Sequence, residues 1–190
     1  MNGGTSTVTA GWLGPGPAGG MTAAAAVHPG VAGGAGHRPG MRAWPLFTGL
    51  GPMGALPTAP GLARAFTALA LGSWDLTGVP DLAQTSELIA SELSTNVVRL
   101  ATGEDGSAVY QADGRLTQLW LRLMSDRTQV QIEIWDNLPQ SAGLPVLRHP
   151  EENEEHGRGL QLVDRLSRDW GWSPVPGMRA KLVWALLDVR

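Results

Sequence analysis

The sequence predicts an α+β fold, a two-layer sandwich with helices packed on one face of a mixed, mostly antiparallel sheet. Two observations predict it. Residues 41–190 are expected to run, in order, as strand, helix, helix, strand, strand, loop, helix, strand and strand. Apolar residues recur with helical spacing in the helical segments and alternate with polar residues in the strands. This order favours a sheet that carries its helices on one face.

Residues 1–40 are predicted to form a disordered tail, and residues 41–190 a single α/β domain. The tail is mostly Gly, Ala, Pro and Thr, with Arg38 as its one charged side chain. Such a stretch offers little apolar area to offset the entropy of ordering. The chain shows neither a basic export signal nor a run of about 18 apolar residues, so we expect a cytoplasmic protein with no membrane partner.

Composition excludes several classes of site. The chain has no cysteine, which removes disulfides, thiolate metal ligands and cysteine nucleophiles. Its formal net charge of −3 gives no basic surface for direct binding of nucleic acid. Lys181 is the only lysine and lies in an Ala-Lys-Leu context near the end of the chain. That position fits neither a Walker A loop nor the phosphate-pairing lysine of a eukaryotic-type protein kinase.

The first strand is expected over residues 41–48, where Pro45 limits pairing and favours the edge of the sheet. A first helix is expected over residues 61–74. Its apolar residues recur with helical spacing along one side, which we take as the buried side: Leu62, Phe66, Leu69 and Ala70.

Asp81 is a suitable N-cap for a second helix that runs to about Ala101. At about 100° per residue, five apolar residues form a buried stripe along it. They are Leu82, Ile89, Leu93, Val97 and Leu100.

Two strands follow, over residues 119–123 and 130–134, joined by a hairpin turn at residues 125–127. Residues 137–156 are rich in Pro and Glu and predict a long loop. A third helix is expected to open at residues 157–159 and to end at Gly171. Its inner stripe would be Leu160, Val163, Leu166 and Trp170. Strands over residues 172–175 and 178–187 close the chain.

Glu92 and Asn96 lie four residues apart on the flank of the second helix, with Arg99 nearby. The amide oxygen of asparagine can coordinate Mg²⁺, which takes few protein ligands and keeps most of its waters. A glutamate can orient or deprotonate an attacking nucleophile. These residues therefore indicate a ligand site, although an ordinary polar helix edge would show the same pattern.

Two further positions could bind a nucleotide. Asp136 continues the buried face of its strand, where a carboxylate needs a hydrogen-bond donor such as an adenine amino group. An Asx turn that ends the strand is the alternative. Gly157, Arg158, Gly159 and Leu160 open a helix, where free amides and the helix dipole favour phosphate. A flexible loop entering a helix is the alternative there.

Together these segments resemble the GHKL ATPases, the Bergerat-fold family of histidine kinases, gyrase and MutL. The nearest branch is the bacterial anti-sigma-factor serine/threonine kinases of the actinobacterial type. The resemblance covers about residues 41–190. It rests on the segments Glu92–Arg99 (ELSTNVVR), Ile134–Asp136 (IWD), Gly157–Val163 (GRGLQLV) and Leu182–Trp184 (LVW).

The resemblance implies a role for each site residue. Glu92 would be the general base and Asn96 the Mg²⁺ ligand. Asp136 would hold the adenine amino group, and Gly157 and Gly159 would lie along the phosphates of ATP under a lid. Arg99, Arg158 and Leu160 would complete the nucleotide site.

The resemblance also implies a function. A kinase of this branch phosphorylates a Ser or Thr of an anti-anti-sigma partner and otherwise sequesters a sigma factor. Whether the chain forms a homodimer is left open. Three residues depart from the pattern: Leu138 stands where a small residue is frequent, Leu182 where a Thr commonly supports the adenine side, and Leu100 where a His is frequent. The alternative is therefore a non-catalytic module that sequesters a sigma factor or another regulator, with nucleotide binding weak or lost.

Overall fold

Five antiparallel strands form one sheet in the order β1-β2-β3-β5-β4. This computed structural model describes residues 44–103, 107–108, 110–111, 114–138, 145, 158–175 and 180–190, with residue 158 described by its backbone alone. The strands are β1 (Leu46–Gly54), β2 (Gln118–Ser125), β3 (Gln129–Asp136), β4 (Asp169–Pro174) and β5 (Lys181–Asp188). The helices are α1 (Ala59–Ser73), α2 (Leu82–Leu100) and α3 (Arg158–Leu166). Within this part of the chain the α+β prediction is confirmed, and every strand pairing is antiparallel.

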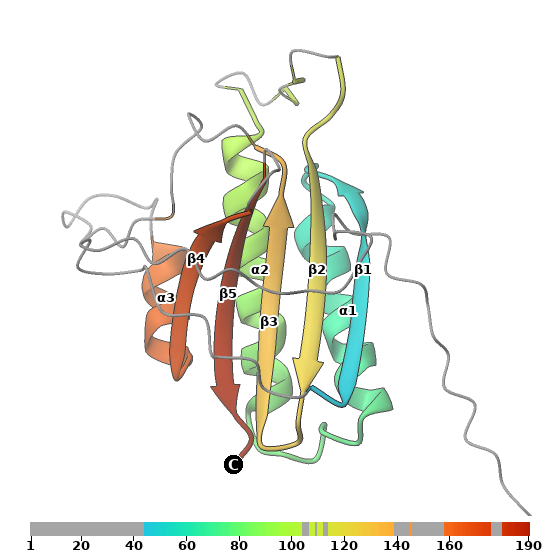
Figure 1. Cartoon of the computed structure of the whole chain (residues 1–190), viewed down its shortest axis with the longest axis vertical. Helices are drawn as coiled ribbons and strands as arrows, with labels where there is room; N and C mark the ends of the chain where they lie inside the picture. The colour runs from blue at the N-terminus through green and yellow to red at the C-terminus, as the bar shows by residue number, and fades with distance from the viewer. Residues whose placement is uncertain are drawn as a thin grey trace, which may run out of the picture.

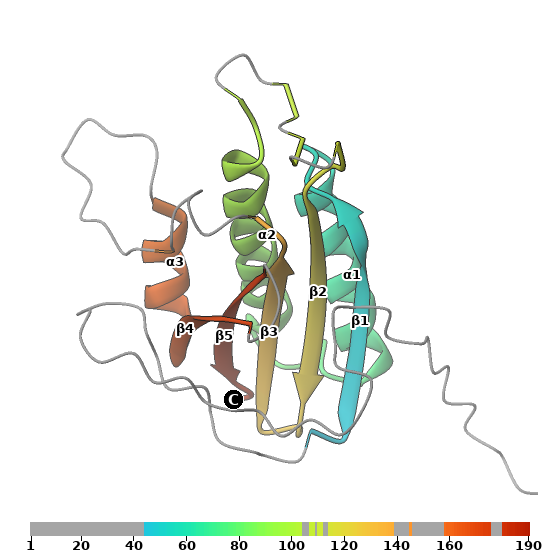
Figure 2. The ribbon, with the colours of Figure 1, turned by 45° about the horizontal axis from the view of Figure 1, so that its top comes forward.

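The described helices lie on one face of the sheet, as Figures 1 and 2 show. The reason is the alternation in the central strands, because every second residue of β2, β3 and β5 is apolar and points to the same face. These residues pack against Ile89, Leu93 and Val97 of α2 in the main hydrophobic core. The sheet contributes Leu119, Leu121, Leu123, Val130, Ile132, Ile134, Val183, Ala185 and Leu187 to this core.

The opposite face of the sheet has a second apolar cluster, formed by Trp120, Trp135, Leu182, Trp184 and Leu186. Trp184 is fully buried and belongs to the core of this face. The neighbouring positions on this face are polar and also buried, with Arg122 paired to Glu133 across β2 and β3. Cross-strand pairs of residues therefore lie alternately on the helix side of the sheet and on this second side.

The predicted first strand is shifted: β1 begins at Leu46, after Pro45, and runs to Gly54. Pro52 lies inside this edge strand because the register shifts between Leu50 and Met53, where no ladder bond from a proline N–H is required. Gly51 has φ of 138°, and a Cβ there would lie 2.8 Å from Cδ1 of Trp120. Glycine is therefore required for the strand to pass this tryptophan.

The predicted buried side of α1 is half right: Ala70 is buried and Phe66 packs against the core, but Leu62 and Leu69 are exposed. The helix begins earlier than expected, because Pro60 in the first turn has no N–H that needs an intrahelical partner. Its buried side consists largely of small residues, Ala59, Ala63, Thr67, Ala70 and Leu71. Small side chains let α1 pack closely on α2. Each of them buries less apolar area than a large side chain would.

The second helix is close to its prediction, with two exceptions. Asp81 is the N-cap residue, as expected, but it has a left-handed backbone (φ 58°) and its side chain makes no capping hydrogen bond. Leu100 is 36% exposed and is therefore not part of the buried stripe. At this end of the helix the buried side is formed by Val97, Val98 and Ala101.

The third helix ends earlier than predicted. After Leu166 the backbone N–H of Arg168 donates to the carbonyl of Leu186, which begins the pairing of β4 with β5. Trp170 and Gly171 therefore belong to β4 rather than to a helix. Trp170 is still a core residue and donates through Nε1 to Asp164 of α3.

The predicted tail (residues 1–40) and most of the predicted loop (residues 137–156) lie outside the described residues. Within the described part of the chain, no helix is long and apolar enough to span a bilayer.

Candidate functional site

Glu92 and Asn96 lie on the flank of α2, as the helical spacing predicts. Their neighbours Leu93 and Val97 face the core and are almost fully buried. Glu92 and Asn96 themselves are half-buried, while Arg99 is exposed. Two polar side chains are thus held one turn apart at the margin of the core, and both can reach a ligand at this margin.

Gly159, in the first turn of α3, lies directly against these two side chains. A Cβ at Gly159 would lie 2.6 Å from Oε2 of Glu92 and 3.8 Å from Nδ2 of Asn96. Helix α3 packs on α2 in the described structure. Residues that are 63 or more positions apart in the sequence therefore meet, and a Cβ at position 159 would require the Glu92 carboxylate to move.

Replacing Gly159 by Ala should test this contact. Gly→Ala within a helix normally stabilises by about 0.5–1 kcal/mol, because alanine loses less conformational entropy on folding. We expect that gain to be absent or reversed for Gly159→Ala, since its Cβ would displace Glu92. The measurement is the free energy of unfolding in urea.

Gly61→Ala is the matched control, because Gly61 lies in the first turn of α1 and has no atom within 4 Å of an added Cβ. We expect this control to show the ordinary gain. Equal stabilisation by both substitutions would contradict the close contact between α3 and Glu92.

The Asn96 carboxamide has one atom with a partner and one without. Its Oδ1 accepts a hydrogen bond of 3.4 Å from Nη2 of Arg99. Its Nδ2 is buried and lacks a partner within the described structure. A buried donor without a partner is costly, so this nitrogen is placed to donate to a ligand. Serving as a Mg²⁺ ligand would require the carboxamide to turn its oxygen to the site.

Asp136 ends β3 and faces the helix layer, in phase with Ile132 and Ile134. Its side chain is fully buried. Oδ1 accepts a hydrogen bond of 3.0 Å from the backbone N–H of Leu138, which is the Asx turn expected as the alternative. Oδ2 has no partner among the described residues. The turn and a ligand-binding role are thus compatible, since each uses a different oxygen.

Lys181 is the residue that the sequence prediction missed. It is the cross-strand partner of Asp136, and its Nζ donates to Oδ1 at 2.9 Å. Burial raises the pKa of the Asp136 carboxyl, and the positive charge of Lys181 offsets part of this rise. The feature that would have identified Lys181 is that the first residue of β5 pairs with the last residue of β3. This pairing is known only once the register of the sheet is known.

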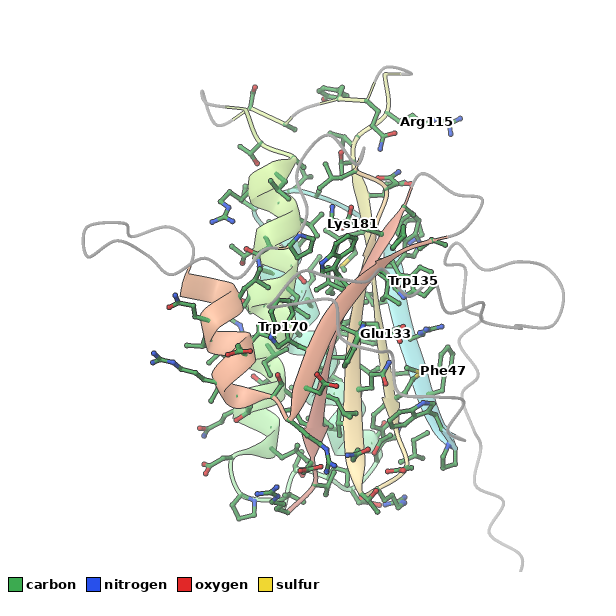
Figure 3. The ribbon with its side chains drawn as sticks, turned by 60° about the vertical axis from the view of Figure 1, so that its left-hand side comes forward. Phe47, Arg115, Glu133, Trp135, Trp170 and Lys181 are labelled. Carbon is green, nitrogen blue, oxygen red and sulfur yellow. The ribbon has the colours of Figure 1, made fainter. Side chains whose placement is uncertain are left out.

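By sequence, Leu182 stands at the position where a Thr commonly supports the adenine. The register of β5 shows that Leu182 does not face Asp136. Leu182 packs with Trp120, Trp135 and Trp184 on the second face of the sheet. Side chains alternate along β5, so Lys181 faces the helix layer beside Asp136 and Leu182 does not. Figure 3 shows Lys181 on the helix side of the sheet and Trp135 on the opposite side.

The predicted site residues come from three elements, α2, β3 and α3, and Lys181 adds a fourth, β5. The C-terminal ends of α2 and β3 lie at the same end of the sandwich, with the start of β5 beside β3 (Figure 1). Leu160 of α3 is half-buried and packs against the core. The predicted contributions of Gly157 and the Arg158 side chain lie outside the described residues. The structure therefore brings Glu92, Asn96 and Gly159 together and places Asp136 at the end of the sheet.

Comparison with known proteins assigns the family. No curated protein matches the chain significantly. The sequence model of one family, described as the histidine kinase-like ATPase domain, matches residues 55–184, which is more than half of the chain. The match includes Glu92, Asn96, Asp136 and Gly159 together with all three helices and β2 to β4. On this match, the chain belongs to the histidine kinase-like ATPase domain family.

Proposed function

We propose that this chain is an ATP-binding regulatory protein that transfers the γ-phosphoryl group of Mg-ATP to a Ser or Thr of a partner protein. The contact of Gly159 with Glu92 and Asn96 carries the proposal. It joins a helix start, where phosphate binds, to the carboxylate that would activate the hydroxyl of the partner.

The nucleotide would be held at its two ends. The unpartnered Oδ2 of Asp136 accepts a hydrogen bond from the adenine amino group, which satisfies a buried acceptor. The first turn of α3 offers backbone N–H groups and the positive end of the helix dipole to the phosphates. Gly159 lets the main chain approach them, and Gly157 and Arg158 would extend this phosphate contact.

Asn96 would hold Mg²⁺, and Glu92 would accept the proton of the attacking hydroxyl. The metal ion, when bound, supplies positive charge that stabilises the phosphate oxygens. Arg99 donates to the Asn96 oxygen, and this bond would be exchanged for the metal when the carboxamide turns its oxygen to the site. Leu160 packs against the core and fixes the first turn of α3 on α2.

The partner fitting this proposal is an anti-anti-sigma protein, with a sigma factor as a second partner. A second candidate function is a binding module that sequesters such a regulator and needs no nucleotide. The Lys181–Asp136 ion pair favours it, because Asp136 already has a charged partner in the protein itself. The kinase and the sequestering module therefore differ in whether ATP binds at this site.

The magnesium dependence of ATP binding tests the proposed site. The wild-type chain should bind Mg-ATP saturably by calorimetry and bind more weakly when EDTA removes the metal. Asn96→Ala should lower the affinity for Mg-ATP by about tenfold or more, since even residues behind a metal ligand contribute that much. Its affinity for metal-free ATP should stay near the wild-type value.

Gln84→Ala is the matched control, because Gln84 is an exposed amide on the same helix. It should leave both affinities unchanged. Absence of any Mg-ATP binding by the wild-type chain would overturn the proposed function and leave the sequestering module. Equal loss of metal-free and Mg-ATP binding in Asn96→Ala would show that Asn96 binds the nucleotide rather than the metal.

A further inference from the structure

Lys181 and Asp136 form a buried ion pair at the end of the sheet where the base would bind. Their side chains are 5% and 0% exposed, and Nζ lies 2.9 Å from Oδ1. A lysine is rarely buried unless it is paired. This is the only lysine of the chain, and its position at the start of β5 places it opposite the last residue of β3.

The pair fixes how Asp136 presents its two oxygens. Oδ1 accepts from both Lys181 and the backbone N–H of Leu138. Oδ2 accepts from no group in the described part of the chain. Rotation of the carboxylate is opposed by two donors on the same oxygen, one of them charged. Asp136 therefore offers a single, fixed acceptor to a ligand.

We propose that Lys181 is a specificity-determining residue that makes this site select purine nucleotides with a 6-amino group over those with a 6-oxo group. The proposal rests on the proposed binding of ATP and goes beyond it by naming the residue that sets base preference. A carboxylate accepts hydrogen bonds only, so Oδ2 attracts an amino group and repels a carbonyl oxygen.

The charge of Lys181 is what keeps Asp136 an acceptor. The residue opposite Asp136 on β2 is the apolar Leu119, and Lys181 supplies the charge that opposes the effect of burial on the carboxyl pKa. Without Lys181, burial favours the protonated carboxyl. A protonated carboxyl can donate as well as accept, so a 6-oxo group would be tolerated.

Calorimetry with Mg-ATP and Mg-ITP tests the proposal, because inosine differs from adenosine by the 6-oxo group and the N1 proton. The wild-type chain should prefer Mg-ATP by about tenfold or more, the usual effect of leaving one buried polar group unpaired. Lys181→Met should narrow this ratio by about tenfold at neutral pH. Lys181→Arg, which keeps a cationic donor, should retain the wild-type ratio.

Asp136→Asn provides a second test that leaves Lys181 in place. Both donors on Oδ1 would hold the amide oxygen at that position and turn the NH₂ group toward the base. The ratio should therefore reverse in favour of Mg-ITP. This variant keeps the proposal falsifiable if Lys181→Met does not fold.

The outcomes separate the two proposals. A wild-type chain that binds neither nucleotide would overturn the proposed function and this inference with it. A wild-type chain that prefers Mg-ATP, with the same ratio in Lys181→Met or in Asp136→Asn, would overturn the role of Lys181 alone. A narrowed ratio in Lys181→Met supports the role of Lys181, and a reversed ratio in Asp136→Asn supports the fixed orientation of the Asp136 side chain on which that role depends.

Discussion

Replacing Glu92 by Gln should reduce phosphoryl transfer to the partner protein by about 10²–10⁴-fold, the usual contribution of a general base. Glutamine has nearly the same shape as glutamate but cannot accept the proton of a hydroxyl. Because Glu92 is half-buried at the margin of the core, the isosteric change should not disturb the packing of α2. The Kd of Mg-ATP should stay within about threefold of the wild-type value. The measurement is transfer of radiolabel from ATP to a co-encoded partner protein.

Glu87→Gln is the matched control for this experiment. Glu87 is a half-buried carboxylate on the same helix, five positions before Glu92 and so on a different side. It should leave transfer unchanged. Wild-type transfer by Glu92→Gln would remove Glu92 from the role of base. Failure of the wild-type chain to label any co-encoded partner would favour the sequestering module.

The location of the site could be predicted from the sequence because its parts depend on local rules. Helical spacing alone places Glu92 and Asn96 side by side on α2. Strand alternation alone places Asp136 on the buried face of β3. The position of Gly159 at a helix start follows from the composition of the loop before it. The contact between Gly159 and Glu92 needed the packing of α3 on α2, which no single segment specifies.

The pairing of Asp136 with Lys181 could not be predicted, because it depends on the register between β3 and β5. A shift of one residue would have brought Leu182 to the same face, as the sequence prediction assumed. Similarly, the buried side of α1 could not be predicted from hydrophobicity. Close helix packing selected small residues there and left Leu62 and Leu69 exposed.

The largest effect on stability should come from the buried ion pair on the second face of the sheet. Arg122 donates through Nε to Oε2 of Glu133 at 2.6 Å, and its Nη2 contacts the same oxygen. Glu133 also accepts from Gln131 Nε2 at 2.6 Å and from Trp135 Nε1 at 3.1 Å. The Arg122 guanidinium lies 5.0 Å from the centre of the Trp135 ring. One carboxylate thus satisfies three donor side chains that have almost no access to water.

Glu133→Leu should lower the free energy of unfolding by about 3–5 kcal/mol, because it removes the buried carboxylate that accepts from Arg122, Gln131 and Trp135. Arg122→Met should cost less, since the remaining carboxylate keeps its hydrogen bonds from Gln131 and Trp135. In the double variant Arg122→Met/Glu133→Leu no charge stays buried. Its loss should therefore fall well below the sum of the two single losses. Unfolding in urea measures all three.

Arg168→Met is the matched control, because the Arg168–Asp188 pair has a similar length (3.0 Å) but its arginine is 58% exposed. An exposed pair contributes less than about 1 kcal/mol. Should Glu133→Leu cost no more than Arg168→Met, the second face would be open to water and the burial of Glu133 would be wrong. A large loss for Glu133→Leu with a strong coupling to Arg122 would instead show that this face is closed. Glu133 and Lys181 lie on opposite faces of the sheet. The Arg122–Glu133 ion pair can therefore stabilise the sheet without contacting the proposed nucleotide site.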